Sequence, residues 1–360
     1  MRLVFVTQSV DEADPILGAT VAKLRALARR CDALVVICDR IGEHDLPENV
    51  ELRTFGAPSR VERGLRYVRA LVPLLLRPRG RRPDAVIAHM CPIYLVLAAP
   101  FAKPLRVPLV IWYTHWTIDR TLRAATALCD LALSVDRRSY PLESSKVLGI
   151  GHGIDVDQFA ARAAPPPPSP RLRLLAIGRT SPSKGFPTLV SAVAACAAAG
   201  VELEVELRGP STTEEEKRHL EELRELVRAE RVEEVVSIAG PVPRPQVPEL
   251  IRAADAVVNT TVGQTAGGAL DKVVYESAAC GVPIFACNPH FDQFLADLPV
   301  ELRFDSENAP DLARVLRAFA VADEATRAEA GAELRRRVES GHSVDSWADA
   351  VVGVVGGFRR

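Results

Sequence analysis

Two glycine-containing loops in the second half of the chain hold the residues best suited to bind an anion. Residues 263–283 read GQTAGGALDKVVYESAACGVP, in which a run of small residues changes at Leu270 into a helix pattern that glycine and proline end. A helix that starts after such a loop presents backbone N–H groups and the positive end of its dipole, which suits phosphate or sugar hydroxyls. Three charged residues lie within two turns of this helix start: Asp271, Lys272 and Glu276.

The second loop is GRTSPSKG at residues 178–185, between an expected strand and an expected helix. Arg179 can grip a diphosphate with two parallel hydrogen bonds, while Lys184 acts as a point charge. Gly178 and Gly185 allow the backbone to bend around the anion. The spacing is not that of a P-loop, so the sequence does not predict magnesium-dependent triphosphate chemistry. The alternative for both loops is a turn whose glycines and cations serve only local structure.

The elements around these loops alternate between short apolar strands and helices, which predicts an α/β fold with parallel sheets. In the first half we expect strands at 3–6, 33–38, 84–89, 109–113, 130–134 and 146–150, and helices at 19–30 and from about Asp136. In the second half we expect strands at 172–177, 203–208, 235–239, 256–259 and 284–286, and helices at 187–199, 214–229 and 246–254. The remainder is mostly helical.

The length of 360 residues favours two domains. The clearest linker is ARAAPPPPSP at residues 161–170, because consecutive prolines form a stiff extended spacer. We therefore expect an N-terminal Rossmann-like domain at 1–160 and a C-terminal domain at 171–340. A last helical segment follows at 341–360.

Composition limits the classes of function. The formal net charge of −1 argues against nucleic acid as a partner. The seven cysteines form no CxxC pair and read as reduced core residues rather than disulfides or a zinc site. The N-terminus begins directly as a strand, and no apolar run approaches the roughly 20 residues of a membrane span. We expect a cytoplasmic protein, at most peripheral on the inner membrane face.

The first half offers weaker candidates. His115, in WYTHW, follows an expected strand, where a substrate-contacting side chain would lie, although a histidine that only caps the loop is the alternative. Gly18 precedes a helix and could admit an acceptor or phosphate closely. Asp155 and Asp157 could be taken for a metal-binding DxD motif, but no further oxygen ligands lie near them in the sequence.

The segment 59–77 is basic and amphipathic. Arginines alternate with apolar residues, and Glu62 is its single acidic residue. Such a helix suits an anionic membrane surface. A solvated face of an ordinary helix packed on the sheet is the alternative.

Three motifs together resemble the family 4 retaining glycosyltransferases, which have the GT-B architecture. GRTSPSKG is similar to the G-R-x(4)-K-G segment of that family, VLGIGHGIDVDQF to its V-x-P-N-G-I-D-x-x-x-F segment, and ESAACGVPIFA to its E-A-M-A-C-G-x-P-V-x-A segment. The resemblance covers nearly the whole chain, most strongly residues 147–290. It implies two Rossmann-like domains that face each other across a cleft.

The resemblance also implies the roles of individual residues. A nucleotide-diphosphate sugar, with UDP or GDP, would be held by Arg179 and Lys184 at the diphosphate and by Glu276 at the ribose. His115 would lie near the transferred hexosyl group, with Gly18 on the acceptor side. Backbone N–H groups would come from the loop of Thr265, Ala266, Gly267 and Gly268. The acceptor would be a sugar or a lipid-linked hydroxyl, and the reaction would need neither metal nor cofactor.

One departure concerns the first of the two family glutamates, which would fall at Gly268. The sequence G-A-L-D-K before Glu276 indicates a variant subgroup in which Asp271 and Lys272 take over contacts to the sugar. Two alternatives keep the fold and change the function. One is a nucleotide-sugar epimerase, and the other is a catalytically inactive subunit that binds the nucleotide sugar and regulates a partner.

Overall fold

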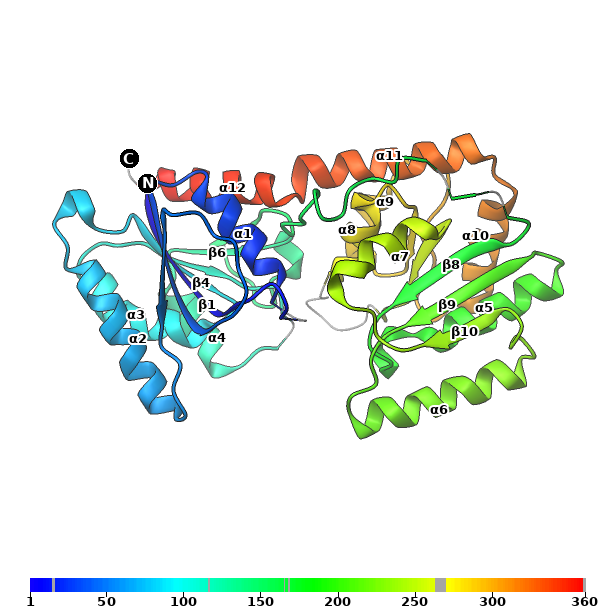
Figure 1. The fold of residues 1–360 in the computed structure, drawn as a ribbon, viewed down its shortest axis with the longest axis horizontal. Coiled ribbons are helices and arrows are strands. Elements are labelled where there is room, and N and C mark those ends of the chain that lie inside the picture. Colours follow the sequence, from blue (N-terminus) through cyan, green and yellow to red (C-terminus); the bar gives the residue numbers. More distant parts are fainter. Residues whose placement is uncertain (15–16, 116, 165, 168, 263–269, 359–360) are drawn as a thin grey trace. The chain divides into compact units, whose positions relative to one another are not determined.

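The computed structural model describes residues 1–14, 17–115, 117–164, 166–167, 169–262 and 270–358. The chain divides into two compact units, of which the first comprises Met1–Asp155 and Gly341–Arg360 and the second Val156–Ser340. Each unit contains one parallel sheet with helices packed on it (Figure 1). The α/β fold class is therefore confirmed.

The sheet of the first unit has seven strands in the order β3-β2-β1-β4-β5-β6-β7, all parallel. Phe5 pairs with Val36 on one side and Ile87 on the other, so β1 is central and apolar. The strand order reverses between β1 and β4, which in such folds is the edge where ligands bind. The strands are β1 (Arg2–Val10), β2 (Ala33–Ile41), β3 (Val50–Thr54), β4 (Ala85–His89), β5 (Leu109–Trp112), β6 (Leu131–Ser134) and β7 (Val147–Gly149).

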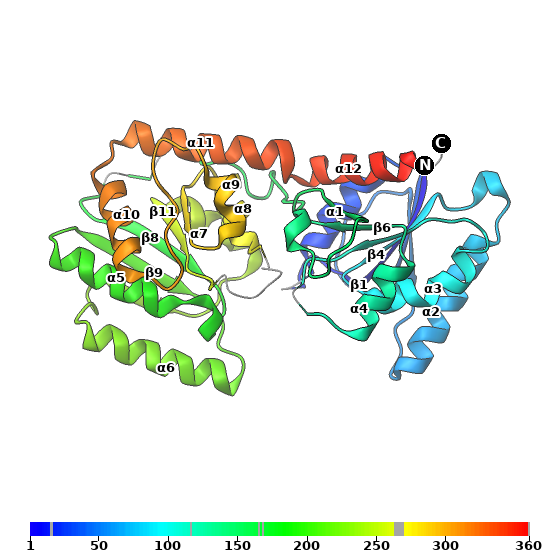
Figure 2. The same ribbon diagram turned by 180° about the vertical axis from the view of Figure 1, so that it is seen from behind.

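Helices cover both faces of this sheet (Figures 1 and 2). On one face α1 (Ala19–Ala28) lies beside α12 (Val344–Gly357), where Arg30 pairs with Asp345 and Asp349. Trp347 of α12 is fully buried and meets the ring of Trp112 edge-on, so it anchors α12 to the sheet. On the other face lie α2 (Arg60–Leu75), α3 (Pro92–Ala102) and α4 (Arg120–Leu128).

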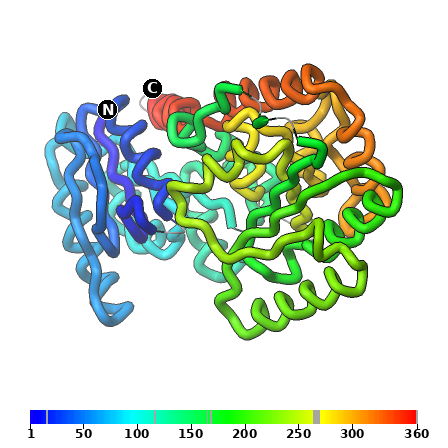
Figure 3. Tube along the Cα trace, turned by 45° about the vertical axis from the view of Figure 1, so that its right-hand side comes forward, coloured from blue at the N-terminus to red at the C-terminus, as the bar shows by residue number. Residues whose placement is uncertain are grey.

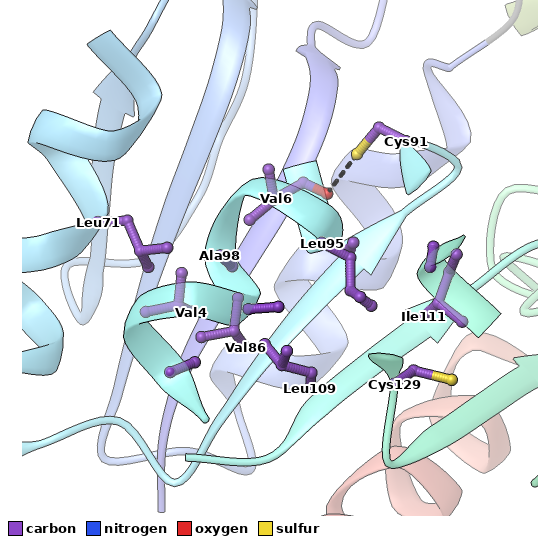
Figure 4. Close-up of a cluster of buried hydrophobic side chains, with 14 of the residues drawn as sticks. Val4, Val6, Leu71, Val86, Cys91, Leu95, Ala98, Leu109, Ile111 and Cys129 are labelled. Atoms are coloured by element: carbon purple, nitrogen blue, oxygen red, sulfur yellow. Dashed lines mark hydrogen bonds between the residues drawn. The ribbon is translucent and has the colours of Figure 1, made fainter. Parts of the chain in front are cut away.

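The core under α2 and α3 holds those two helices in place. Figure 4 shows Leu71 of α2 and Leu95 and Ala98 of α3 directed at Val4 and Val86 of the sheet. All of these side chains are buried. Removing such a side chain to alanine costs about 2–5 kcal/mol in a packed core, so both helices are firmly attached to the sheet.

The sheet of the second unit has five parallel strands in the order β10-β9-β8-β11-β12, with the reversal between β8 and β11. The strands are β8 (Leu172–Ile177), β9 (Leu203–Arg208), β10 (Val236–Ala239), β11 (Ala256–Asn259) and β12 (Ile284–Ala286). The helices are α5 (Phe186–Ala198), α6 (Glu214–Ala229), α7 (Val247–Ala253), α8 (Lys272–Ala279), α9 (Asp292–Leu295), α10 (Ala309–Val321) and α11 (Glu324–Gly341). Figure 3 traces this part of the chain from green to orange.

The helix expected from about Asp136 is wrong. The chain forms only a short 3-10 turn, Arg137–Ser139, because Asp136 caps the turn and Pro141 restricts Tyr140 to an extended backbone. Three elements were not expected from the sequence: β3, α3 and α4. The apolar run of α3 contains Pro100 and lacks helical alternation between apolar and polar residues, which hides its period.

Along the chain, the boundary between the first and the second unit falls after Asp155, before the proline-rich segment 161–170. Phe159 is buried in the second unit, and its carbonyl accepts a hydrogen bond from Arg335 of α11. The side chain of Arg162 likewise donates to the carbonyl of Ala254. These contacts attach the segment that follows Asp155 to the second unit. Among the helices that the structure describes, none is long and apolar enough to cross a membrane.

Candidate functional site

In the second unit, the loop at 178–185 lies beside residues 260–262 and beside Asp271, which stand before and after the part of the second loop that is outside the described residues. The loop at 178–185 follows β8 and the loop from Thr260 follows β11, and these are the neighbouring strands between which the order reverses. The backbone N–H of Val262 donates to the carbonyl of Ser183 at 3.0 Å, and Thr260 Oγ1 donates to the carbonyl of Lys184 at 2.7 Å. The loop at 178–185 and residues 260–262 are thus joined at the edge where an α/β sheet binds its ligand.

Glycine is required at Gly185 and makes room for a side chain at Gly178. Gly185 has φ of +62°, and a Cβ there would lie 2.2 Å from the carbonyl oxygen of Thr260. A Cβ at Gly178 would lie 3.1 Å from Cδ of Lys184, so the stem of this lysine rests on the glycine. The glycines of GRTSPSKG therefore allow the close approach of the two loops and set the course of the Lys184 side chain.

Lys184 is bound by Asp271. Its Nζ lies 2.7 Å from Asp271 Oδ2, and the same oxygen accepts hydrogen bonds from Asn259 Nδ2 at 2.9 Å and from Thr261 Oγ1. Burial opposes ionisation of Asp271 and is the largest single influence on its pKa, but Lys184, Thr261 and Asn259 together outweigh it and hold the pKa below its usual value. The carboxylate is therefore charged and fixes the ammonium group.

Asp271 also occupies the residue position before α8, which begins at Lys272, but its side chain makes no capping hydrogen bond. The carboxylate is turned to Lys184 instead of to the first turn of its own helix. Burial lowers the pKa of Lys272 despite the opposing influence of Glu276. The helix start thus combines backbone N–H groups with an ammonium group whose charge is weakly solvated, an arrangement suited to an anion.

Glu276 lies on α8, where its side chain is 4% exposed and its Oε1 lies 2.7 Å from Nη2 of Arg244. The guanidinium of Arg244 also stacks over the ring of Phe159, with 5.0 Å between the guanidinium carbon and the ring centroid. Sequence reasoning missed Arg244. An arginine between prolines directly after a strand, in PVPRPQ, is the signal that could have indicated it.

Arg179 extends from the same loop as Lys184 but remains largely exposed, with 62% of its side chain accessible. Its Nη1 lies 3.1 Å from Glu216 Oε1, and Glu216 also accepts backbone hydrogen bonds from Thr212 and Thr213 at the start of α6. Only Arg179 is exposed in this pair, since the Glu216 side chain is 5% accessible, and the hydrogen bonds from Thr212 and Thr213 still hold Glu216 when Arg179 turns to a bound anion.

Four predicted donor contacts, Thr265, Ala266, Gly267 and Gly268, lie outside the described residues. The structure brings together Gly178, Lys184 and Asp271, with Lys272 adjacent to Asp271 in the chain.

The remaining candidates, His115 and Gly18, belong to the first unit. His115 Nδ1 accepts a hydrogen bond from the backbone N–H of Thr117 at 3.1 Å, which leaves its proton on Nε2 in the neutral ring. Partial burial lowers the pKa of His115. A Cβ at Gly18 would lie 2.6 Å from the carbonyl oxygen of Glu12, so this glycine already accommodates the chain's own loop. Within the described ranges, no cluster of three or more His, Cys, Asp or Glu is arranged to hold a metal.

Comparisons of the sequence with known proteins find matches that cover part of the chain. A family model described as glycosyl transferase-like matches residues 193–353, somewhat less than half of the chain. A curated relative, the D-inositol 3-phosphate glycosyltransferase of Kribbella flavida, is 32% identical over 162 residues, which is 41% of this chain. The match spans 36% of the length of that relative.

Solved structures match over the whole length. HepE of Anabaena in complex with UDP aligns with a TM-score of 0.75 at 18% identity, covering 99% of this chain and all of HepE. Sucrose-phosphate synthase of Thermosynechococcus elongatus aligns with a TM-score of 0.70 at 15% identity, covering 98% of each chain. The fold is that of the GT-B glycosyltransferases, and the family model and the curated relative that match parts of this chain are both described as glycosyltransferases.

Proposed function

We propose that this protein is a retaining glycosyltransferase of family 4 that moves a hexosyl group from a UDP- or GDP-sugar to an acceptor hydroxyl in glycan or glycolipid biosynthesis. The observation that carries the proposal is the pairing of Lys184 with Asp271 at the sheet edge of the second unit where the strand order reverses. A similar fold in HepE was solved with UDP and with UDP and glucose, which supports a nucleotide sugar as the donor.

The departing diphosphate would be stabilised by fixed positive charge. Lys184 is held in place by Asp271, Arg179 is available from the same loop, and the start of α8 adds its backbone N–H groups. Donors and cations that are already oriented stabilise developing charge without reorganisation. We therefore propose that transfer requires no metal and no cofactor.

The nucleoside would be held by Glu276, whose carboxylate accepts hydrogen bonds from the ribose hydroxyls. Arg244 orients this carboxylate by a direct ion pair. We place His115 near the transferred hexose and Gly18 on the acceptor side, with Lys272 and the loop of residues 265–268 at the sugar. The protein would work in the cytoplasm, with a peripheral contact to the inner membrane face through residues 59–77.

Incubation of the protein with each of several nucleotide sugars and a panel of acceptors tests this function, with release of nucleoside diphosphate as the first readout. We expect release from a UDP- or GDP-sugar that persists in EDTA, and a product whose anomeric configuration, measured by NMR, equals that of the donor. A product of inverted configuration would refute the retaining assignment. Interconversion of the free nucleotide sugar without transfer would identify an epimerase.

A further inference from the structure

The carboxylate of Glu276 is oriented by one side chain. Glu276 lies in the middle of α8, where its side chain is 4% exposed, and its Oε1 lies 2.7 Å from Nη2 of Arg244. Within the described ranges, no other group donates a hydrogen bond to this carboxylate. Because a hydrogen bond between two charged groups is strong, the carboxylate turns with the guanidinium that holds it. Whatever fixes Arg244 therefore also fixes Glu276.

The guanidinium of Arg244 is held by an aromatic ring and by its own backbone. Its carbon lies 5.0 Å from the ring centroid of Phe159, and Phe159 is only 1% exposed. The flat guanidinium group can stack on a ring in a way that a lysine ammonium cannot. Arg244 also begins a short 3-10 turn between Pro243 and Pro245, which restrict the backbone on both sides of it.

Arg335 of α11 holds Phe159 in turn. Its Nη1 donates to the carbonyl of Phe159 at 2.8 Å and also to the carbonyl of Ala279. Ala279 is the last residue of α8, three residues after Glu276. A cation at the end of a helix stabilises its last carbonyl groups. Since α11 runs past the end of α8 (Figures 1 and 2), Arg335 ties the backbone of Phe159 to the helix that carries Glu276.

These contacts form a closed chain within the second unit. Arg335 holds Phe159, Phe159 stacks on Arg244, and Arg244 pairs with Glu276. Glu276 lies on α8, whose last carbonyl is bound by Arg335 again. A binding group is positioned accurately when its own neighbours are fixed by packing and hydrogen bonds, and each member of this chain is fixed in that way.

We propose that Phe159 and Arg335 are positioning residues for ribose recognition. Through Arg244 they hold the carboxylate of Glu276 in the orientation that accepts hydrogen bonds from the 2′- and 3′-hydroxyls of a ribonucleotide, and they do not touch the nucleotide themselves. This inference rests on the proposed function and deepens it. It makes α11 and the segment that follows Asp155 determine the selection of a ribonucleotide over its 2′-deoxy form.

Two arginines of α11 offer a matched pair of variants. Arg335→Met keeps the apolar stem and removes the groups that donate to Phe159 and Ala279. Arg337→Met is the control, because Arg337 likewise donates from Nη1 to two carbonyls of the second unit, those of Phe294 at 2.8 Å and Ala296 at 2.7 Å. Neither of these carbonyls belongs to the closed chain of contacts.

Calorimetric titration of the full chain with UDP, GDP and their 2′-deoxy forms measures the selection as a ratio of two affinities. A merely structural role would lower both affinities together and leave the ratio unchanged. The wild type should bind its ribonucleotide about tenfold more tightly than the deoxy form, because the deoxy form lacks a hydroxyl that donates to a buried carboxylate. Arg335→Met and Phe159→Leu should each reduce this ratio about threefold, whereas Arg337→Met should not change it.

A double variant tests whether the ring acts through the guanidinium. Phe159→Leu should have no further effect on the ratio when Arg244→Met is already present. An unchanged ratio in Arg335→Met and Phe159→Leu, or an equal loss in Arg337→Met, would overturn the proposal. If the wild type binds a ribonucleotide but does not distinguish its deoxy form, this inference fails and the proposed function stands. If the wild type binds neither UDP nor GDP, the proposed function fails as well.

Discussion

The ion pair between Lys184 and Asp271 yields a quantitative prediction. Replacing Lys184 by Met keeps the stem that rests on Gly178 and removes only the charge. Asp271 then stays ionised without its counterion, although Asn259 and Thr261 still donate to it. Both charged side chains are 19% exposed. The cost therefore falls between the roughly 0–1 kcal/mol of a surface pair and the roughly 3–5 kcal/mol of breaking a buried one, at about 2 kcal/mol.

The matching double variant separates the charge from the packing. Lys184→Met combined with Asp271→Asn removes both charges. Because no ion remains unpaired, this double variant should be only about 1 kcal/mol less stable than wild type. For a unit of this size about 2 kcal/mol corresponds to a fall of about 4–8 °C in Tm. Scanning calorimetry, which resolves separate transitions of the two units, is the assay.

The difference in stability between wild type and Lys184→Met should vanish at a pH low enough to protonate Asp271, whose pKa lies below its ordinary value of 3.8. This follows because a carboxylate with a lowered pKa stabilises the fold at neutral pH and loses that contribution as pH falls. Equal melting temperatures of the single and double variants at neutral pH would refute the reasoning that Asp271 is the counterion of Lys184.

The remaining predictions concern single positions. Gly185→Ala should lower the Tm of the second unit, because the φ of +62° and a carbonyl oxygen that would lie 2.2 Å from a Cβ exclude a side chain there. Thermal unfolding measures this, and an unchanged Tm would contradict it. Glu276→Gln should weaken UDP or GDP binding about tenfold, measured by titration, because it loses the ion pair with Arg244 as well as its own charge. His115→Ala should lower kcat more than it raises the Kd of the donor. Burial lowers the pKa of His342 from 6.5 to about 4, so between those pH values the unfolded chain binds more protons than the folded chain. The free energy of unfolding should therefore rise by about 3 kcal/mol as the pH increases over this range. His342→Gln should flatten the rise in Tm that accompanies it.

Much of the fold follows from local pattern. Strands such as Ala256–Asn259 and Leu203–Arg208 have the expected bounds because each is a short run between turn signals and lies in a parallel sheet. The helix Glu214–Ala229 is likewise bounded as expected, since Thr213 and Glu216 form a capping box. The edge strand Val50–Thr54 was missed because its sequence, VELRT, is polar at every second residue and only partly buried.

The sequence predicted which loops form the candidate site, but it did not predict which side chains in the site form ion pairs. The motifs placed Lys184 in a loop after a strand and Asp271 at a helix start, yet nothing local indicated that their side chains, 87 residues apart in sequence, would meet. The same holds for Arg244, which reaches Glu276 across 32 residues. Contacts of this kind depend on strand order and on which way each side chain turns, and a single sequence does not encode either in a local pattern.

We propose above all that the second unit binds a nucleotide sugar beside the loop at 178–185 and Asp271. Isothermal titration of wild type and Lys184→Met with UDP, GDP and their hexose derivatives, in EDTA, tests it most directly. Binding of one nucleotide by wild type, at least tenfold weaker in Lys184→Met and unaffected by the chelator, is the predicted result. Absence of binding by wild type to all of them, or equal binding by the variant, would contradict the claim.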